Sequence, residues 1–167
     1  MSTAHGLRID PARPEDVPDI VDLIRQLAEY ERLANEVRVD PADLREHLFG
    51  RRRFAEAVLA KAGEETVGFA LFFHNYSTFA GKAGLYLEDL FVRPGHRGKG
   101  YGAALLRHLA GIAVDRDCAR FEWSVLDWNQ DAIDFYRKLG AVPMNEWTVF
   151  RLDGGALREL AGGSPAK

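Results

Sequence analysis

Residues 85–106 read LYLEDLFVRPGHRGKGYGAALL, and the order of elements in this stretch decides the fold. Residues 85–92 predict a β-strand, which Pro94 ends. Apolar residues then recur at helical spacing, so the sequence predicts a helix over residues 103–114. Residues 121–126 predict the next strand. A strand, a crossover helix and a second strand place the two strands parallel in one sheet.

The flanking elements are predicted from the same periodicities and from proline, glycine and capping residues. Upstream lie a strand at residues 7–9, helices at 14–32 and 41–49, and a hairpin of strands at 57–60 and 67–73. Downstream lie a helix at 132–139, a last strand at 147–152 and a short helix at 156–160. This order predicts a mixed α/β sheet, mostly antiparallel and flanked by helices, in a single domain over residues 1–167.

Composition excludes several classes of protein. With 22 basic and 25 acidic side chains, the net charge of −3 leaves no overall electrostatic footprint for nucleic acid. The three arginines at residues 51–53 are typical of a solvated loop. The single cysteine, Cys118, excludes an internal disulfide, and the scattered histidines show no metal-ligand spacing, so we expect no metal. Without an apolar leader or a run of ~18 apolar residues, we expect a cytoplasmic protein with no membrane partner.

The stretch RGKGYG at residues 97–102 predicts an anion-binding loop. Its alternate glycines let backbone N–H groups approach a ligand, and the start of a helix adds unpaired N–H groups and a positive dipole end. Arg97 and Lys99 add charge, so the loop suits a pyrophosphate. The spacing G-x-G-x-G is neither the dinucleotide fingerprint nor a P-loop. A flexible surface turn is the plain alternative.

Two acids interrupt the apolar strand before this loop. Adjacent strand residues face opposite sides, so Glu88 and Asp89 are not expected to be simple core positions together. A pair of acids in such a strand is costly unless it faces a cleft, water or a partner. Both are therefore candidates for the functional site.

The motif Arg97-x-x-Gly100-x-Gly102 after a strand resembles the acetyl-CoA signature of the GNAT acetyltransferase superfamily. Further stretches are similar to its diamine acetyltransferase branch, which includes the spermidine/spermine and thialysine enzymes: LAEYE at 27–31, YLED at 86–89, DWNQ at 127–130 and FYRKLGA at 135–141. The resemblance covers roughly residues 7–162. It implies a GNAT-like sheet whose fourth and fifth strands are parallel and splayed, acetyl-CoA as acetyl donor, a small-molecule amine as substrate, and a homodimer.

The resemblance also implies roles for individual residues. The pantetheine arm of acetyl-CoA would pair with the backbone of Leu90, Phe91 and Val92. The pyrophosphate would lie on Arg97, Gly98, Lys99, Gly100, Tyr101, Gly102 and Ala103. A second cofactor contact falls on Asn129, Gln130, Asp131 and Ala132. The amine would contact Tyr30, Glu31, Glu88, Asp89, Glu122, Trp123 and Ser124.

Elementary chemistry agrees with the role of Glu88 and with a role for one further residue, Tyr136. An aliphatic amine has a pKa near 10.4, so only on the order of one molecule in 10³ is neutral at pH 7. Glu88 can remove the proton or bind the cation, and Tyr136, which matches the tyrosine next to the thioester sulfur, can protonate the leaving thiolate. Backbone amides near Leu90 or Phe91 would stabilise the oxyanion.

One loop departs from the polyamine enzymes. Members specific for polyamines carry an acid and a tryptophan where this chain has Ser77 and Phe79. The stretch therefore resembles the thialysine enzymes more closely, and a lysine-like amino acid is expected beside a diamine or polyamine. The open alternatives are another amine (a peptide, an aminoglycoside or a herbicide-like compound), a non-catalytic acyl-CoA-binding module, and a nucleotide-binding oxidoreductase, against which the glycine spacing argues.

Overall fold

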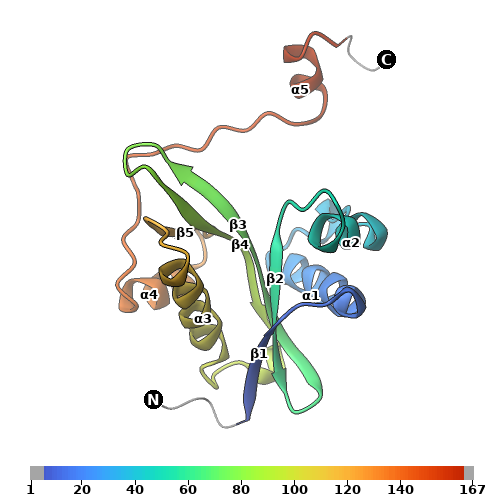
Figure 1. The fold of residues 1–167 in the computed structure, drawn as a ribbon, viewed down its shortest axis with the longest axis vertical. Coiled ribbons are helices and arrows are strands. Elements are labelled where there is room, and N and C mark those ends of the chain that lie inside the picture. Colours follow the sequence, from blue (N-terminus) through green and yellow to red (C-terminus); the bar gives the residue numbers. More distant parts are fainter. Residues whose placement is uncertain (1–5, 164–167) are drawn as a thin grey trace. The chain divides into compact units, whose positions relative to one another are not determined.

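The computed structural model describes residues 6–163 (Figure 1). The strands are β1 (Leu7–Pro11), β2 (Glu56–Ala62), β3 (Glu65–Ser77), β4 (Lys82–Val92) and β5 (Phe121–Trp123). The helices are α1 (Val17–Tyr30), α2 (Pro41–Phe49), α3 (Tyr101–Asp115), α4 (Gln130–Lys138) and α5 (Gly154–Leu160). Short 3-10 turns lie at η1 (Pro14–Asp16), η2 (Ala34–Glu36) and η3 (Pro94–His96). The chain divides into two compact units, residues 1–124 and residues 125–167.

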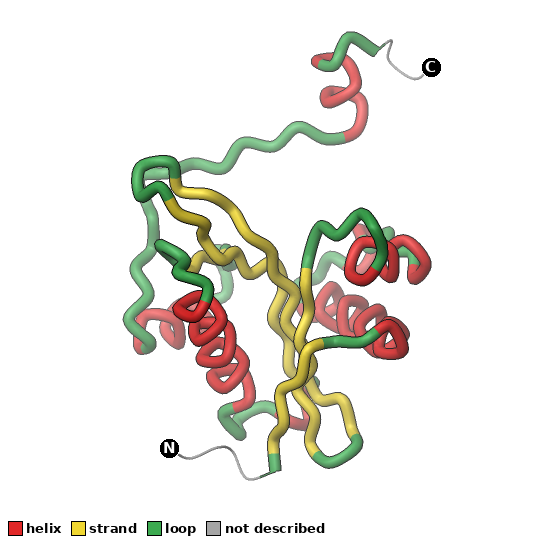
Figure 2. The backbone as a smooth tube through the Cα atoms, in the orientation of Figure 1, coloured by secondary structure: helices red, strands yellow, loops and turns green. Residues whose placement is uncertain are grey.

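The first unit contains one five-stranded sheet in the order β1-β2-β3-β4-β5 (Figure 2). Strands β1 to β4 pair antiparallel with their neighbours. Strand β5 follows β4 through the crossover helix α3 and pairs with it in parallel. The expected mixed, mostly antiparallel sheet with a parallel pair formed by its fourth and fifth strands is confirmed.

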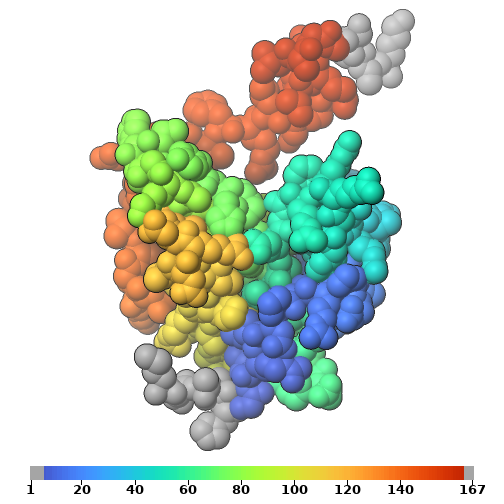
Figure 3. Space-filling view, viewed as in Figure 1, coloured from blue at the N-terminus to red at the C-terminus, as the bar shows by residue number. Residues whose placement is uncertain are grey.

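Helices cover both faces of this sheet. Figure 1 shows α1 and α2 on one face and α3 on the other, and the surfaces of α1 and α2 adjoin one another (Figure 3). The apolar stripe of α1 buries Ile20 and Leu23 completely, against a cluster that includes Phe69 and Phe91. Each such side chain contributes about 1.5–3 kcal/mol of transfer free energy. Phe91 thereby fixes the end of β4 to α1.

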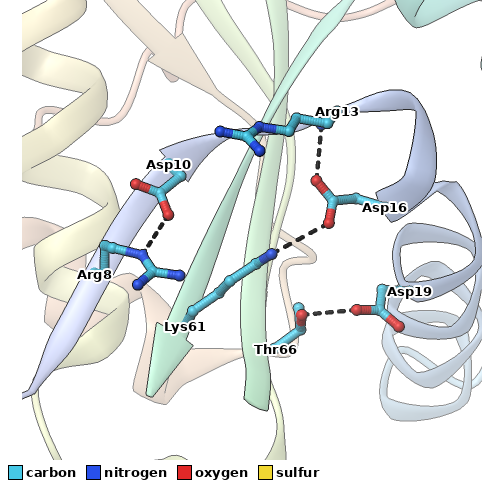
Figure 4. A network of polar contacts seen from close by, with 7 residues as sticks. All are labelled: Arg8, Asp10, Arg13, Asp16, Asp19, Lys61 and Thr66. Carbon is cyan, nitrogen blue, oxygen red and sulfur yellow. Dashed lines mark hydrogen bonds and ion pairs between the residues drawn. The ribbon is translucent and has the colours of Figure 1, made fainter. Parts of the chain in front are cut away.

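A polar network fixes the start of α1 to the sheet (Figure 4). The buried carboxylate of Asp16 accepts a hydrogen bond from the Arg13 backbone N–H at 2.8 Å and pairs with Lys61 Nζ at 3.2 Å. The Thr66 hydroxyl donates to Asp19 at 2.7 Å. Because Lys61 and Thr66 lie on β2 and β3, these contacts hold α1 against the β2–β3 hairpin.

Three sequence-based expectations differ from the structure. The first helix is split, because a 3-10 turn at residues 14–16 precedes α1. Strand β5 ends at Trp123, three residues earlier than expected. The strand expected at residues 147–152 is wrong: this stretch carries no strand assignment, and the side chains of Trp147, Val149 and Phe150 are 75%, 83% and 92% exposed. Strands form only with a partner for their backbone groups, and no segment within the described chain pairs with this stretch.

The helices of residues 6–163 are all too short or too polar to cross a membrane.

Candidate active site

The sheet opens between β4 and β5. Their parallel pairing covers three positions and stops at Leu87, which lies opposite Trp123. Strand β4 continues to Val92, and among residues 6–163 no strand pairs with this edge beyond Leu87. Backbone N–H and C=O groups on such an edge can bind an extended ligand. The structure therefore provides the edge on which the backbone of Leu90, Phe91 and Val92 was expected to hold a pantetheine arm.

A β-bulge begins where the two strands separate. On β3, Phe72 lies opposite Leu87 and Leu71 lies opposite Asp89, so Glu88 is one extra residue in β4. The bulge interrupts the regular register, and Glu88 is exposed while Asp89 is partly buried, so the two acids are not core positions together, as expected. A bulge sets two residues against one on the partner strand and re-aims their side chains. Both acids oppose Leu71.

Three carboxylates interact at this place. Burial raises the pKa of Asp89 to about 6, and the negative charges of Glu88 and Glu31 add to the effect. Glu31 directly follows the last residue of α1, and burial raises the pKa of its carboxyl group as well. The structure thus brings together three of the expected substrate residues. Crowded, partly desolvated carboxylates of this kind are stabilised by a bound cation, such as a protonated amine.

The glycine loop follows β4 as expected and has the features of an anion-binding site. Gly98 and Gly100 have φ angles of 76° and 80°, which favour glycine, and a Cβ on either would meet open space. Gly100 is the N-cap of the 15-residue helix α3, whose first N–H groups have no carbonyl partner within the helix. Glycines in open space, free helix N–H groups and the exposed Lys99 fit the pyrophosphate of acetyl-CoA.

Two side chains of the loop point to other roles. Tyr101 is buried and its ring stacks on His96 with centroids 6.4 Å apart, so only its backbone is available to a ligand. Arg97 Nε donates to the Val92 carbonyl oxygen at 3.0 Å, and its guanidinium lies over the Tyr30 ring at 4.6 Å. The motif alone did not reveal this contact with α1. Gly102 and Ala103 lie in the first turn of α3.

The expected residues of β5 are engaged with their own neighbours. Glu122 pairs with Arg120 Nε at 2.7 Å and accepts from Asn75 Nδ2 at 3.3 Å. The Ser124 and Tyr86 hydroxyl groups are 2.9 Å apart, and the Trp123 and Phe121 rings are in contact.

The remaining expected residues belong to the second unit and are described within it. Asn129 caps α4, because its Oδ1 accepts from the Ala132 backbone N–H at 3.3 Å. Gln130 Nε2 donates to Asp134 at 2.7 Å, and Asp131 lies beside them in the first turn of the helix. The Tyr136 ring lies 5.6 Å from that of Phe135, centroid to centroid.

Comparisons with known proteins agree with this arrangement. Residues 20–141 match the model of the acetyltransferase (GNAT) family. The chain is 39% identical to thialysine N-epsilon-acetyltransferase of Sus scrofa, covering 92% of this chain and 96% of that protein. It is 33% identical to L-ornithine N5-acetyltransferase of Arabidopsis thaliana, covering 95% and 90%. Among solved structures, an integron cassette protein from the mobile metagenome of V. cholerae superimposes with a TM-score of 0.79 at 28% identity, covering 93% and 98%.

Both the match to the family model and the relatives extend over most of the chain, and they include β4, the glycine loop and α3. The chain therefore belongs to the acetyltransferase (GNAT) family and is an acetyl-CoA-dependent enzyme that transfers an acetyl group to an amine.

Proposed function

We propose that this enzyme acetylates the side-chain amine of a basic amino acid. The observation that supports this most directly is the group of Glu31, Glu88 and Asp89 beside the open edge of β4. A protonated side-chain amine would be attracted by these carboxylates to the edge on which the donor lies. The names of two relatives place the acetyl group on the side-chain nitrogen of thialysine and of ornithine.

The loop between β3 and β4 favours an amino acid over a polyamine. Ser77 is buried at the end of β3, and its Oγ accepts a hydrogen bond from the Ala80 backbone N–H at 3.2 Å. This hydroxyl closes the turn and supplies no negative charge. Phe79 is fully exposed at the tip of the same turn. A long polyvalent cation would gain no carboxylate here, whereas a basic amino acid has one side-chain amine to place.

The reaction needs two proton transfers, one from the substrate ammonium and one to the leaving thiolate. The substrate ammonium loses a proton to Glu88, while Asp89 and Glu31 hold the positive charge before that step. The neutral nitrogen attacks the thioester carbonyl, and backbone N–H groups of β4 near Leu90 stabilise the oxyanion. By the family resemblance, the Tyr136 hydroxyl would give its proton to the thiolate that leaves when the C–S bond breaks. Acetyl-CoA supplies the activated acyl group.

A thiol-release assay tests the proposal. The enzyme and acetyl-CoA are incubated with lysine, thialysine, ornithine, spermidine, an aminoglycoside and a short peptide, and kcat/KM is compared. We expect the basic amino acids to be the best substrates. Glu88→Gln should lower kcat/KM at neutral pH, with part of the loss recovered at higher pH, where more amine is already neutral. A clear preference for spermidine or for the peptide would refute the assignment.

The same enzyme is proposed to be a homodimer. Besides the family resemblance, residues 147–152 support this, because their apolar side chains are exposed and their backbone is unpaired by any described strand. An extended segment of this kind can pair with a second copy of the chain. Light scattering should give twice the mass of one chain, and a monomer mass at working concentration would rule the dimer out.

A further inference from the structure

We propose that Arg97 is a positioning residue that fastens the glycine loop to the end of α1, rather than a ligand of the pyrophosphate. The inference rests on the proposed function only in the choice of substrate for its kinetic test. Its basis is the set of contacts that the guanidinium makes within residues 30–97.

The side chain of Arg97 contacts two other elements. Its Nε donates to the carbonyl oxygen of Val92, the last residue of β4, at 3.0 Å. Its Cζ lies 4.6 Å from the centroid of the Tyr30 ring, at the last residue of α1, and 5.2 Å from that of Phe91. A guanidinium within about 6 Å of a ring centroid is attracted by the negative face of the ring. One side chain thus links the loop, the end of β4 and the end of α1.

This link couples the two substrate sites. Tyr30 directly precedes Glu31, whose carboxylate interacts with Asp89. Phe91 and Val92 lie on the open edge of β4. If the guanidinium is removed, the packing of Phe91 still joins β4 to α1, but the end of α1 at Tyr30 loses its contact with the loop, and the proposed amine-binding carboxylates are held less firmly. In the wild-type protein, the positive charge that binds the pyrophosphate would come from Lys99 and from the N–H groups at the start of α3.

The two roles predict different effects of mutation. A pyrophosphate ligand would affect KM for acetyl-CoA and act independently of Tyr30. A positioning residue would raise KM for the amine or lower kcat at saturating acetyl-CoA, and it would act through the ring of Tyr30. Lys99→Gln provides the contrast, because we expect it to weaken acetyl-CoA binding alone.

A double-mutant cycle separates these possibilities. Arg97→Gln and Tyr30→Leu should each lower kcat/KM for the amine by roughly twofold to thirtyfold, the range expected for a cation–π contact. The kcat/KM of the double variant should be no lower than that of the less active single variant, since both changes break the same contact. Tyr30→Phe keeps the ring, so in this background Arg97→Gln should lower kcat/KM by the same factor as it does in the wild type. Arg107→Gln, an exposed arginine on α3, is the matched control.

A second measurement needs no substrate. Amide hydrogen exchange of residues 28–33, which include the end of α1, should accelerate in Arg97→Gln and in Tyr30→Leu but not in Arg107→Gln. If Arg97→Gln fails to fold, the two Tyr30 variants still carry the test. Unchanged exchange together with an effect on KM for acetyl-CoA alone, or additive effects in the cycle, would overturn the inference. A failure of the wild type to acetylate amino acids would refute the proposed function and leave the exchange result standing.

Discussion

Replacing Asp89 by Asn should make the protein more stable at neutral pH while weakening amine binding. Burial and the charges of Glu88 and Glu31 raise the pKa of the Asp89 carboxyl group from 3.8 to about 6. One pKa unit corresponds to ~1.36 kcal/mol, so ionised Asp89 lowers the free energy of unfolding by about 3 kcal/mol at pH 7. Asparagine has a similar shape and no charge, and it avoids this cost.

The pH dependence has a definite sign. Between pH 3.8 and about 6 the unfolded chain has lost the Asp89 proton while the folded protein still holds it. The unfolded state then binds fewer protons, so the stability contributed by this group falls as the pH rises through that window and is constant above it. The difference in stability between Asp89→Asn and the wild type should therefore grow from pH 4 to pH 6 and then level off.

Urea unfolding at pH 4, 5, 6 and 7 measures this difference. Glu64→Gln is the matched control, because it removes one exposed charge in the turn between β2 and β3 and should give no such trend. In the thiol-release assay, Asp89→Asn should raise KM for the amine, since one of three attracting carboxylates is lost. A stability difference that does not depend on pH, or a variant less stable than the wild type at pH 7, would refute the account of Asp89.

Three further substitutions, one of them with a matched control, test the loop, the sheet and the chemistry. Gly100→Val forces a β-branched residue to a φ of 80°, so calorimetry should show a large loss of acetyl-CoA affinity, with circular dichroism confirming the fold. Gly68→Ala places a Cβ 2.7 Å from the Phe91 carbonyl oxygen and should cost about 1–3 kcal/mol in urea unfolding, whereas Gly111→Ala in α3, which meets open space, should stabilise by ~0.5–1 kcal/mol. Tyr136→Phe keeps the ring and removes the proton, so kcat should fall by ~10²–10⁴ with cofactor binding little changed; a kcat near that of the wild type, with chemistry rate-limiting, would exclude the tyrosine as proton donor.

The parts of the fold that sequence predicted well are those with local signals. The apolar strand before Pro94, the glycines of the loop and the periodic helix α3 each depend on residues close together in the chain. Asp40 directly precedes α2 and caps it, because its Oδ1 accepts hydrogen bonds from the Ala42 and Asp43 N–H groups at 2.8 and 3.1 Å. Such interactions form whatever the distant parts of the chain do.

The features that sequence did not predict depend on contacts between distant segments. The bulge at Glu88 is defined by the register with β3, which no pattern within β4 encodes. The contact of Arg97 with Tyr30 joins residues 67 positions apart (97 − 30). Residues 147–152 have the composition of a strand, but a strand also needs a partner edge, and composition does not supply one.

The bulge explains why the site lies where it does. Pairing between β4 and β5 ends at Leu87, and the extra residue of β4 is the next one, Glu88. A bulge bends its strand and increases the local twist, so β4 turns away from β5 at this residue. Beyond Leu87 the backbone edge of β4 has no described strand as partner, and the carboxylate of Asp89 interacts there with those of Glu88 and Glu31. The inserted residue therefore lies where the proposed donor edge begins and within the group of proposed amine-binding carboxylates.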